Sequence, residues 1–184
     1  DISEPTVVAL YLLPHVNIML RPRLLNELRP GTRVVSHNFD MNEWRPDKSK
    51  DMGAHKILCW IVPANVTGTW RWNAGPDGGT GVMMTVEQDY QRFTATAVAG
   101  ETELAVDDGW IGGEEVSFTL GDGGNGGRRY HGRVDGDTME GSYTTADGTG
   151  ILTFRAERDP GTFRRLTMLN APGRAAQDTL KATS

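Results

Sequence analysis

The chain has 184 residues, of which 38% are hydrophobic and 23% charged, as expected of a globular protein with one large domain or two small ones. The formal net charge of −5 argues against a nucleic-acid partner. No apolar run approaches the roughly 20 residues that span a bilayer, so we expect no membrane partner and favour a cytoplasmic location.

The chain opens with a predicted strand over residues 7–13, a continuous apolar run typical of a strand buried on both faces. A helix is predicted over residues 15–29, where Pro22 should break or restart it and Arg29-Pro30-Gly31 should end it. Its apolar residues lie mostly at helical spacing: Val16, Met19, Leu20, Leu24, Leu25 and Leu28.

Two further strands are predicted over residues 32–39 and 56–62, with a polar loop at 40–55 between them. The first two strands should form a parallel pair with a right-handed crossover. Parallel sheets normally continue on both edges and are covered on both faces. We therefore expect the back end of a larger α/β protein, whose exposed edge at residues 7–13 pairs with a missing N-terminal half or with a second copy.

The distribution of glycine marks a boundary near residues 63–66. Of the 23 glycines, only Gly31 and Gly53 precede residue 66, and 20 lie between residues 66 and 161. This shift divides the chain into an α/β part over residues 1–65, an antiparallel β-domain over 66–158 and a tail over 159–184. The tail could be a short helix or disordered.

The β-domain is predicted from short alternating runs separated by Asp-Gly turns. Its eight strands are predicted at residues 66–72, 81–88, 92–98, 102–107, 115–120, 128–134, 138–143 and 151–157. This spacing predicts an antiparallel meander, closed as a barrel or folded as a sandwich. Residues that share a face should fill the interior: Trp70, Trp72, Phe93, Ala95, Ala97, Val116, Phe118, Leu120, Leu152 and Phe154. Whether the interior is solid or holds a ligand stays open.

A family resemblance is carried by DISEPTVVALYLLPHVNIMLRPRLLNELRPGTRVVSHNFDMNEW, followed by ILCWIVPA. These residues resemble the C-terminal part of a class I, seven-stranded S-adenosylmethionine-dependent methyltransferase. They are most similar to a group of bacterial methyltransferases with an added C-terminal β-domain, which GRVDGDTMEG at residues 132–141 also resembles. The fold that this implies is a partial doubly wound α/β sheet followed by the all-β meander.

The resemblance also bears on the cofactor. The family binds S-adenosylmethionine through a glycine-rich loop after its first strand and an acidic residue after its second, and residues 5–13 resemble its fourth strand. We therefore expect S-adenosylmethionine in the intact parent protein and no cofactor on this chain alone. Glycine runs such as GDGGNGG at residues 121–127 have no helix after them, so they are interpreted as hairpin turns.

Candidate site residues lie where strands end, because ligands of open α/β sheets bind beyond the carboxyl ends of the strands. By the resemblance, Pro14 would form part of an apolar wall beside the methyl acceptor, or it merely opens the helix. His37 is either a polar active-site residue or a hydrogen-bonded loop histidine. Phe39, Asp40 and Trp44 would line the acceptor pocket, although the last two could simply cap and cover the sheet.

Other chemistry finds little support in the sequence. His15, His55 and His131 lie on separate elements without metal-ligand spacing, so no metal site is predicted. The single cysteine, Cys59, lies in an apolar run and is interpreted as structural. No G-x-S-x-G turn is present, and the carboxylates of the β-domain cluster near turns, where solvated carboxylates are common.

Two functions remain as hypotheses. In the first, the chain is the C-terminal portion of a methyltransferase that supplies acceptor-side strands and an accessory β-domain, with an unknown methyl acceptor and no activity by itself. In the second, it is a non-enzymatic module whose barrel binds a small ligand or a protein, with the α/β part as a dimerising platform.

Overall fold

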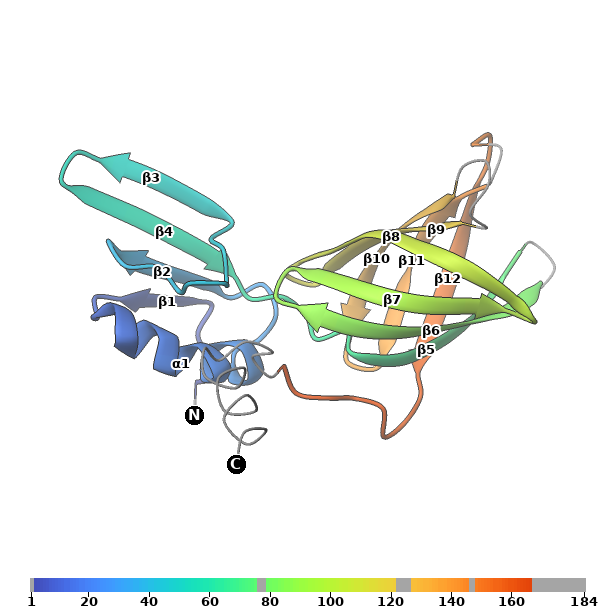
Figure 1. Ribbon diagram of the computed structural model, residues 1–184, viewed down its shortest axis with the longest axis horizontal. Helices are drawn as coiled ribbons and strands as arrows, with labels where there is room; N and C mark the ends of the chain where they lie inside the picture. The colour runs from blue at the N-terminus through green and yellow to red at the C-terminus, as the bar shows by residue number, and fades with distance from the viewer. Residues whose placement is uncertain (1, 76–78, 122–126, 146–147, 167–184) are drawn as a thin grey trace, which may run out of the picture.

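A computed structural model describes residues 2–75, 79–121, 127–145 and 148–166 of the chain. These residues form a four-stranded sheet with one helix and, beside it, a closed eight-stranded barrel (Figure 1). The fold is therefore mostly β. The last part of the predicted tail, from residue 167, lies outside the described residues.

The sheet combines parallel and antiparallel pairing. Its elements are β1 (Val7–Leu10), α1 (Pro14–Glu27), β2 (Arg33–His37), β3 (Lys48–Met52) and β4 (His55–Ile61). The strand order is β1-β2-β4-β3, in which β1 and β2 run parallel through the α1 crossover and β4 runs antiparallel to both of its neighbours. Since β1 stands at one end of this order, its outer edge carries no further strand among the described residues.

Two predicted element bounds in the sheet are wrong. The first strand was expected over residues 7–13 but ends at Leu10, because the chain must leave the sheet before Pro14 begins the helix. The predicted loop at 40–55 contains β3, which forms a hairpin with β4. Every residue of β3 is exposed, so this edge strand lacks the alternating apolar pattern by which a strand is recognised.

The helix runs unbroken through Pro22, contrary to the prediction that this proline would break or restart it. The buried face of α1 also differs from the predicted apolar stripe. Asn17 and Arg21 are buried together with Leu24 and Leu25, whereas Met19 is largely exposed. Polar side chains therefore pack beneath the loop that follows β2.

The strands of the sheet are buried on one face rather than on both. Leu10, Val34 and Ser36 are buried, whereas Val7 is exposed on the opposite face. Cys59, which is half-buried, shares this second face through its register with the middle of β2. Parallel strands are usually covered on both sides, so the sheet presents an incompletely covered apolar face.

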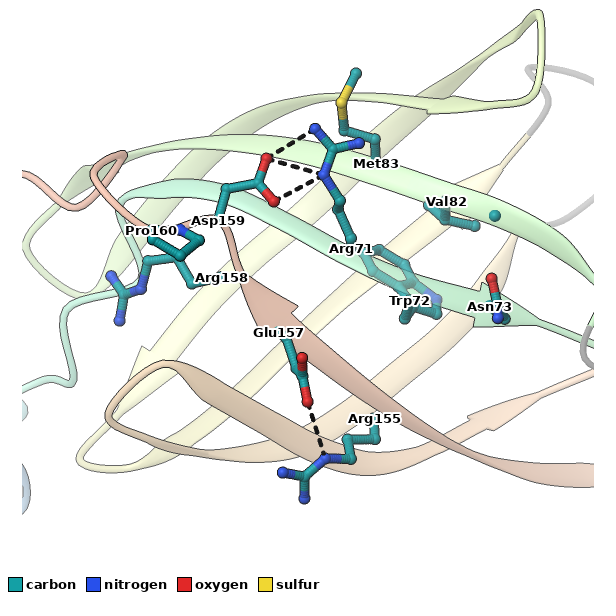
Figure 2. A pocket seen from close by; sticks show the side chains of 11 residues that line it. Arg71, Trp72, Asn73, Val82, Met83, Arg155, Glu157, Arg158, Asp159 and Pro160 are labelled. Carbon is teal, nitrogen blue, oxygen red and sulfur yellow. Dashed lines mark hydrogen bonds and ion pairs between the residues drawn. The ribbon is translucent and has the colours of Figure 1, made fainter.

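The barrel confirms the predicted eight-stranded meander. Its strands are β5 (Gly68–Ala74), β6 (Thr80–Asp89), β7 (Arg92–Ala99), β8 (Thr102–Gly112), β9 (Glu115–Gly121), β10 (Arg128–Asp135), β11 (Thr138–Thr144) and β12 (Ile151–Arg158). Each strand pairs antiparallel with the next, and β12 closes the barrel against β5. The seam between these two strands is seen from close by in Figure 2.

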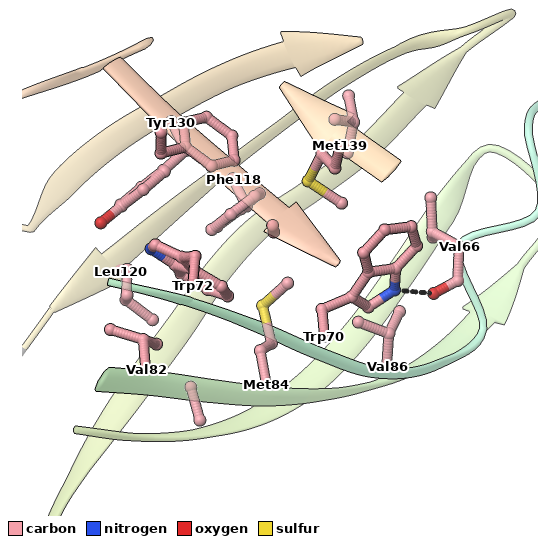
Figure 3. Packing of buried hydrophobic residues seen from close by; sticks show 14 of the residues in the cluster. Val66, Trp70, Trp72, Val82, Met84, Val86, Phe118, Leu120, Tyr130 and Met139 are labelled. Carbon is pink, nitrogen blue, oxygen red and sulfur yellow. Dashed lines mark hydrogen bonds between the residues drawn. The ribbon is translucent and has the colours of Figure 1, made fainter. Parts of the chain in front are cut away.

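Aromatic side chains fill the barrel interior (Figure 3). Tyr130 lies at their centre, stacked on Phe118 with ring centroids 4.8 Å apart and on Tyr143 at 4.7 Å. Trp72 and Phe154 meet the same ring edge-on. The predicted interior residues are buried or packed against this cluster, which confirms the face assigned from their alternation.

The turn between β6 and β7 docks the barrel onto the sheet. The Tyr90 ring stacks on Trp44 with centroids 6.3 Å apart, and the Arg21 guanidinium lies 5.4 Å from the centre of the same ring. Gln91 Nε2 donates to the carbonyl oxygen of Arg45 at 2.9 Å. These contacts tie the barrel to the loop that follows β2.

The chain enters and leaves the barrel at neighbouring points. Thr67 Oγ1 donates to the Arg164 carbonyl oxygen at 2.7 Å, and the Arg164 amide donates back to this hydroxyl at 3.1 Å. The chain then returns to α1, where Asn26 exchanges two hydrogen bonds of 3.0 Å with the backbone of Leu166. Both connections therefore run side by side.

The described helix is neither long nor apolar enough to cross a membrane.

Candidate functional site

The carboxyl ends of β1 and β2 bring an aromatic side chain and two histidines together. The Tyr11 and His37 rings lie 5.0 Å apart between centroids. His37 Nε2 lies 2.9 Å from Nδ1 of His55, which begins β4. One imidazole nitrogen must donate the proton of this bond and the other must accept it. We name Tyr11, His37 and His55 the edge cluster.

A tight turn fixes His37 at the end of its strand. Asn38 adopts a left-handed conformation with φ of 67°, which asparagine tolerates better than most residues. Its amide donates to the Lys56 carbonyl oxygen at 2.7 Å, and its Oδ1 accepts from the Lys56 amide at 2.7 Å. These two bonds clamp β2 to β4 and so hold the two histidines within hydrogen-bonding distance.

Buried polar groups support the turn from below. Ser36 Oγ donates to the Phe39 carbonyl oxygen at 2.7 Å. The Asn17 side-chain amide reaches Ser36 Oγ at 3.2 Å and the same carbonyl oxygen at 3.3 Å. Because Asn17 is fully buried on α1, the helix fixes the position of Phe39, and this explains why a polar residue occupies the inner face of the helix.

Exposed apolar side chains stand at and just after the two strand ends that carry the edge cluster. Tyr11 is 82% exposed, Leu13 58% and Phe39 38%. Pro14 follows directly as the first residue of α1 and is also exposed. Exposed apolar groups beside a hydrogen-bonded histidine pair can contact the aliphatic part of a ligand while the imidazoles accept a proton from it.

The remaining candidates occupy different surroundings. Asp40 is exposed, and its Oδ1 accepts the Asn42 amide at 3.2 Å in the loop after β2. Trp44 is fully buried between Trp60 and Tyr90, at the junction of the sheet and the barrel. Pro14, His37 and Phe39 thus all stand at or just after the carboxyl ends of β1 and β2, whereas Trp44 packs in the interior.

Sequence reasoning missed two members of the edge cluster. Tyr11 was assigned to the first strand, and His55 was placed on an element separate from His37. His55 does lie on a separate element, at the start of β4, but the pairing of β4 with β2 brings it to the end of β2 beside His37. The Gly53 turn, with φ of 69°, was the signal that could have revealed the hairpin of β3 and β4.

The described residues do not provide a nucleotide cradle. Among them the strand-to-helix connection is Tyr11-Leu12-Leu13, which contains no glycine. A glycine-rich turn is what lets backbone amides approach such a ligand closely. No three His, Cys, Asp or Glu side chains within the described part of the chain are grouped so as to hold a metal ion.

Comparison with known proteins identifies relatives of part of the chain, although no family model matches it. Over 46 residues it is 61% identical to a protein-lysine N-methyltransferase of Saccharolobus islandicus (strain REY15A), which covers 25% of this chain and 29% of the relative. The chain is related to methyltransferases. This relative is archaeal, whereas the sequence had suggested a bacterial group.

A solved structure is also similar in part. It is the crystal structure of an RNA methyltransferase from Salinibacter ruber in complex with S-adenosyl-L-homocysteine, with 53% identity over 36% of this chain and 43% of that protein. The TM-score of 0.35 is too low to indicate a shared overall structure. The chain spans less than half the length of either relative.

Proposed function

We propose that the chain is the acceptor-side portion of an S-adenosylmethionine-dependent, class I methyltransferase, with the barrel as an accessory domain. The observation that carries this proposal is the 61% identity over 46 residues to a protein-lysine N-methyltransferase. Identity at this level over such a length goes far beyond what a common strand-helix-strand pattern requires. The methyl acceptor that the relative suggests is a lysine side chain of a protein.

The edge cluster would serve the acceptor. A lysine ammonium must lose a proton before its nitrogen can attack a methyl group, because the protonated nitrogen has no free electron pair. His37 and His55 share one proton across a 2.9 Å bond, which leaves imidazole nitrogen available to take up another. Tyr11 and Phe39 would contact the aliphatic part of the acceptor, with Pro14 as part of the same wall.

The cofactor would be held elsewhere. The described connections offer no glycine-rich strand-to-helix turn, so the described residues do not fit S-adenosylmethionine as a ligand. We therefore assign this chain only the binding and deprotonation of the acceptor.

The exposed edge of β1 would join the chain to its cofactor-binding partner. This strand pairs on one side with β2, and its other edge has no strand partner among the residues that the structure describes. The half-covered apolar face beside it needs a cover as well. A cofactor-binding methyltransferase part is the partner that we propose, and a second copy of the chain is the competing one.

A segment exchange with the archaeal relative tests the function. Residues 2–62 of this chain replace the corresponding part of that lysine methyltransferase, and methyl transfer from isotope-labelled S-adenosylmethionine is followed by mass spectrometry. We expect transfer within about tenfold of the parent rate. A folded chimera that binds the cofactor by calorimetry but transfers no methyl group would refute the proposal.

Variants within the chimera test the role of the histidines separately. His37→Gln and His55→Gln should each lower the transfer rate by roughly 10² to 10⁴, the usual contribution of a general base. Cofactor affinity should be unchanged. Rates that equal the unmodified chimera would remove the histidines from the mechanism and leave the methyltransferase assignment intact.

A further inference from the structure

The barrel wall is incompletely paired along the seam between β5 and β12. Among the described residues, the ladder between these strands consists of Arg71 with Glu157 and Trp70 with Arg158. The neighbouring ladders are longer, because β6 pairs with every residue of β5 and β12 pairs with every residue of β11. The later part of β5 and the earlier part of β12 therefore lack ladder partners on the side of the seam.

The alternation of the backbone identifies the groups that face this gap. The Asp159 amide donates to Thr69 of β5 at 2.7 Å, whereas the Arg158 amide points the other way and donates to Asp137 at 2.9 Å. Alternate residues of a strand direct their backbone groups to the same side. The amides and carbonyls of Arg155 and Thr153 on β12 therefore face β5, without a ladder bond.

Two grooves follow the same seam. The first encloses about 570 Å³ and is lined by Arg71 and Asn73 of β5 and by Arg155 and Glu157 of β12, as Figure 2 shows. The second encloses about 470 Å³ and is lined by Asn73, Arg155 and Phe154 among others. Asn73 and Arg155 line both grooves. If the register continued past Trp72 and Ala156, they would form the next hydrogen-bonded cross-strand pair.

The seam is apolar toward the barrel interior and charged toward the outer surface. Trp72 and Phe154 belong to the buried aromatic interior. The charged residues on the outer side are already paired, Arg71 with Asp159 and Arg155 with Glu140. A ligand in this seam would meet an apolar floor and an outer rim whose charges are neutralised.

We propose that the seam binds an extended peptide segment of a partner protein, which adds a strand beside β12. Unpaired backbone donors and acceptors that recur at every second residue match the backbone of another strand, whereas a compact small molecule would satisfy few of them. The segment alternates apolar side chains, directed toward Trp72 and Phe154, with uncharged polar side chains directed outward. This site is separate from the edge cluster and does not depend on the proposed methyl transfer.

The test uses the full chain and a synthetic probe. The probe is a capped peptide of about eight residues that alternates valine and threonine, with lysine at each end for solubility. Binding is measured by fluorescence anisotropy, and amide hydrogen exchange is measured with and without peptide. In the free protein, the amides of Thr153 and Arg155 should exchange rapidly and that of Phe154 slowly, and the peptide should slow the first two.

A matched pair of variants separates the backbone from the side chain. Thr153→Pro removes the amide that faces the seam and should weaken binding at least tenfold, a cost that one lost hydrogen bond explains. Thr153→Val keeps the amide and should bind as the unmodified chain does. A peptide of the same composition with its valines in one block should bind more weakly than the alternating probe.

Several results would overturn the proposal. In the first, the amides of Thr153 and Arg155 are already as protected from hydrogen exchange as that of Phe154 in the free protein. In the second, the alternating probe fails to bind. Equal binding by the proline and valine variants would also overturn it. So would a dimer in which a second copy of the chain protects Thr153 without added peptide. The hydrogen-exchange result stands by itself if Thr153→Pro does not fold.

Discussion

Replacement of Arg158 by methionine should destabilise the barrel by more than the loss of its ion pair with the exposed Asp137 would. Arg158 is 6% exposed and donates to the carbonyl oxygens of Thr67 at 2.8 Å and Gly136 at 2.7 Å. Its guanidinium also lies 4.6 Å from the centre of the Trp70 ring. The side chain thus links three parts of the barrel end.

The magnitude follows from the groups that lose a partner. Each hydrogen bond from a charged donor contributes roughly 1.5–3 kcal/mol, so the loss at the two carbonyls is about 3–6 kcal/mol. Burial lowers the pKa of Arg158, which means that the interior disfavours its charge, and methionine relieves part of this cost. We expect a net loss of about 3 kcal/mol and a melting temperature lower by about 6–12 °C.

Urea unfolding followed by tryptophan fluorescence measures the effect, and Asp137→Asn is the control. The Asp137 carboxylate pairs with Arg158 at 2.9 Å, but its side chain is 77% exposed. Exposed ion pairs contribute about 0–1 kcal/mol, so the control should lose little stability. Equal losses for the two variants, or a loss below about 1 kcal/mol for Arg158→Met, would refute the reasoning.

Three further outcomes are expected. The hydrogen bond from Arg21 lowers the pKa of Glu43 below its ordinary value of 4.5. The ionised Glu43 therefore stabilises the fold above pH 4.5, and this stabilisation is lost as the pH falls through the pKa of the folded state. The urea midpoint should decline between about pH 5 and 3, and Glu43→Gln should make this decline less steep. Gly141→Ala should cost about 2 kcal/mol or more in urea unfolding, since a Cβ would run into the backbone of β10; a loss close to zero would mean that the two strands can separate. A nitrogen–nitrogen scalar coupling across the bond between His37 and His55 should be visible by NMR, because one ring must donate its proton to the other; absence of this coupling in the folded protein would contradict the bond.

The barrel could be predicted from the sequence because each of its strands carries local signals. Asp-Gly turns and alternating side chains specify where a strand begins and which face is buried, as for Trp70 and Trp72. The strand β3 could not be predicted in this way, since all of its residues are exposed and the pairing of its backbone with β4 forms it.

The candidate site was predictable only in part. His37 stands at a strand end that the sequence reveals, and Phe39 follows in the same turn. The partnership of His37 with His55 depends on a hairpin between them, and the support from Asn17 depends on the packing of the helix beneath the loop. Contacts between distant parts of a chain leave no periodic pattern in the sequence.

The adjacent entry and exit of the barrel make it a transferable module. Thr67 and Arg164 are hydrogen-bonded to each other where the two connections meet. The chain therefore enters and leaves the barrel at one place beside α1. A gene segment that encodes such a lobe can be inserted into a surface connection, or deleted from it, while the ends of the host chain stay together. The same geometry permits circular permutation, and it offers protein engineers a place to graft the barrel onto an unrelated scaffold.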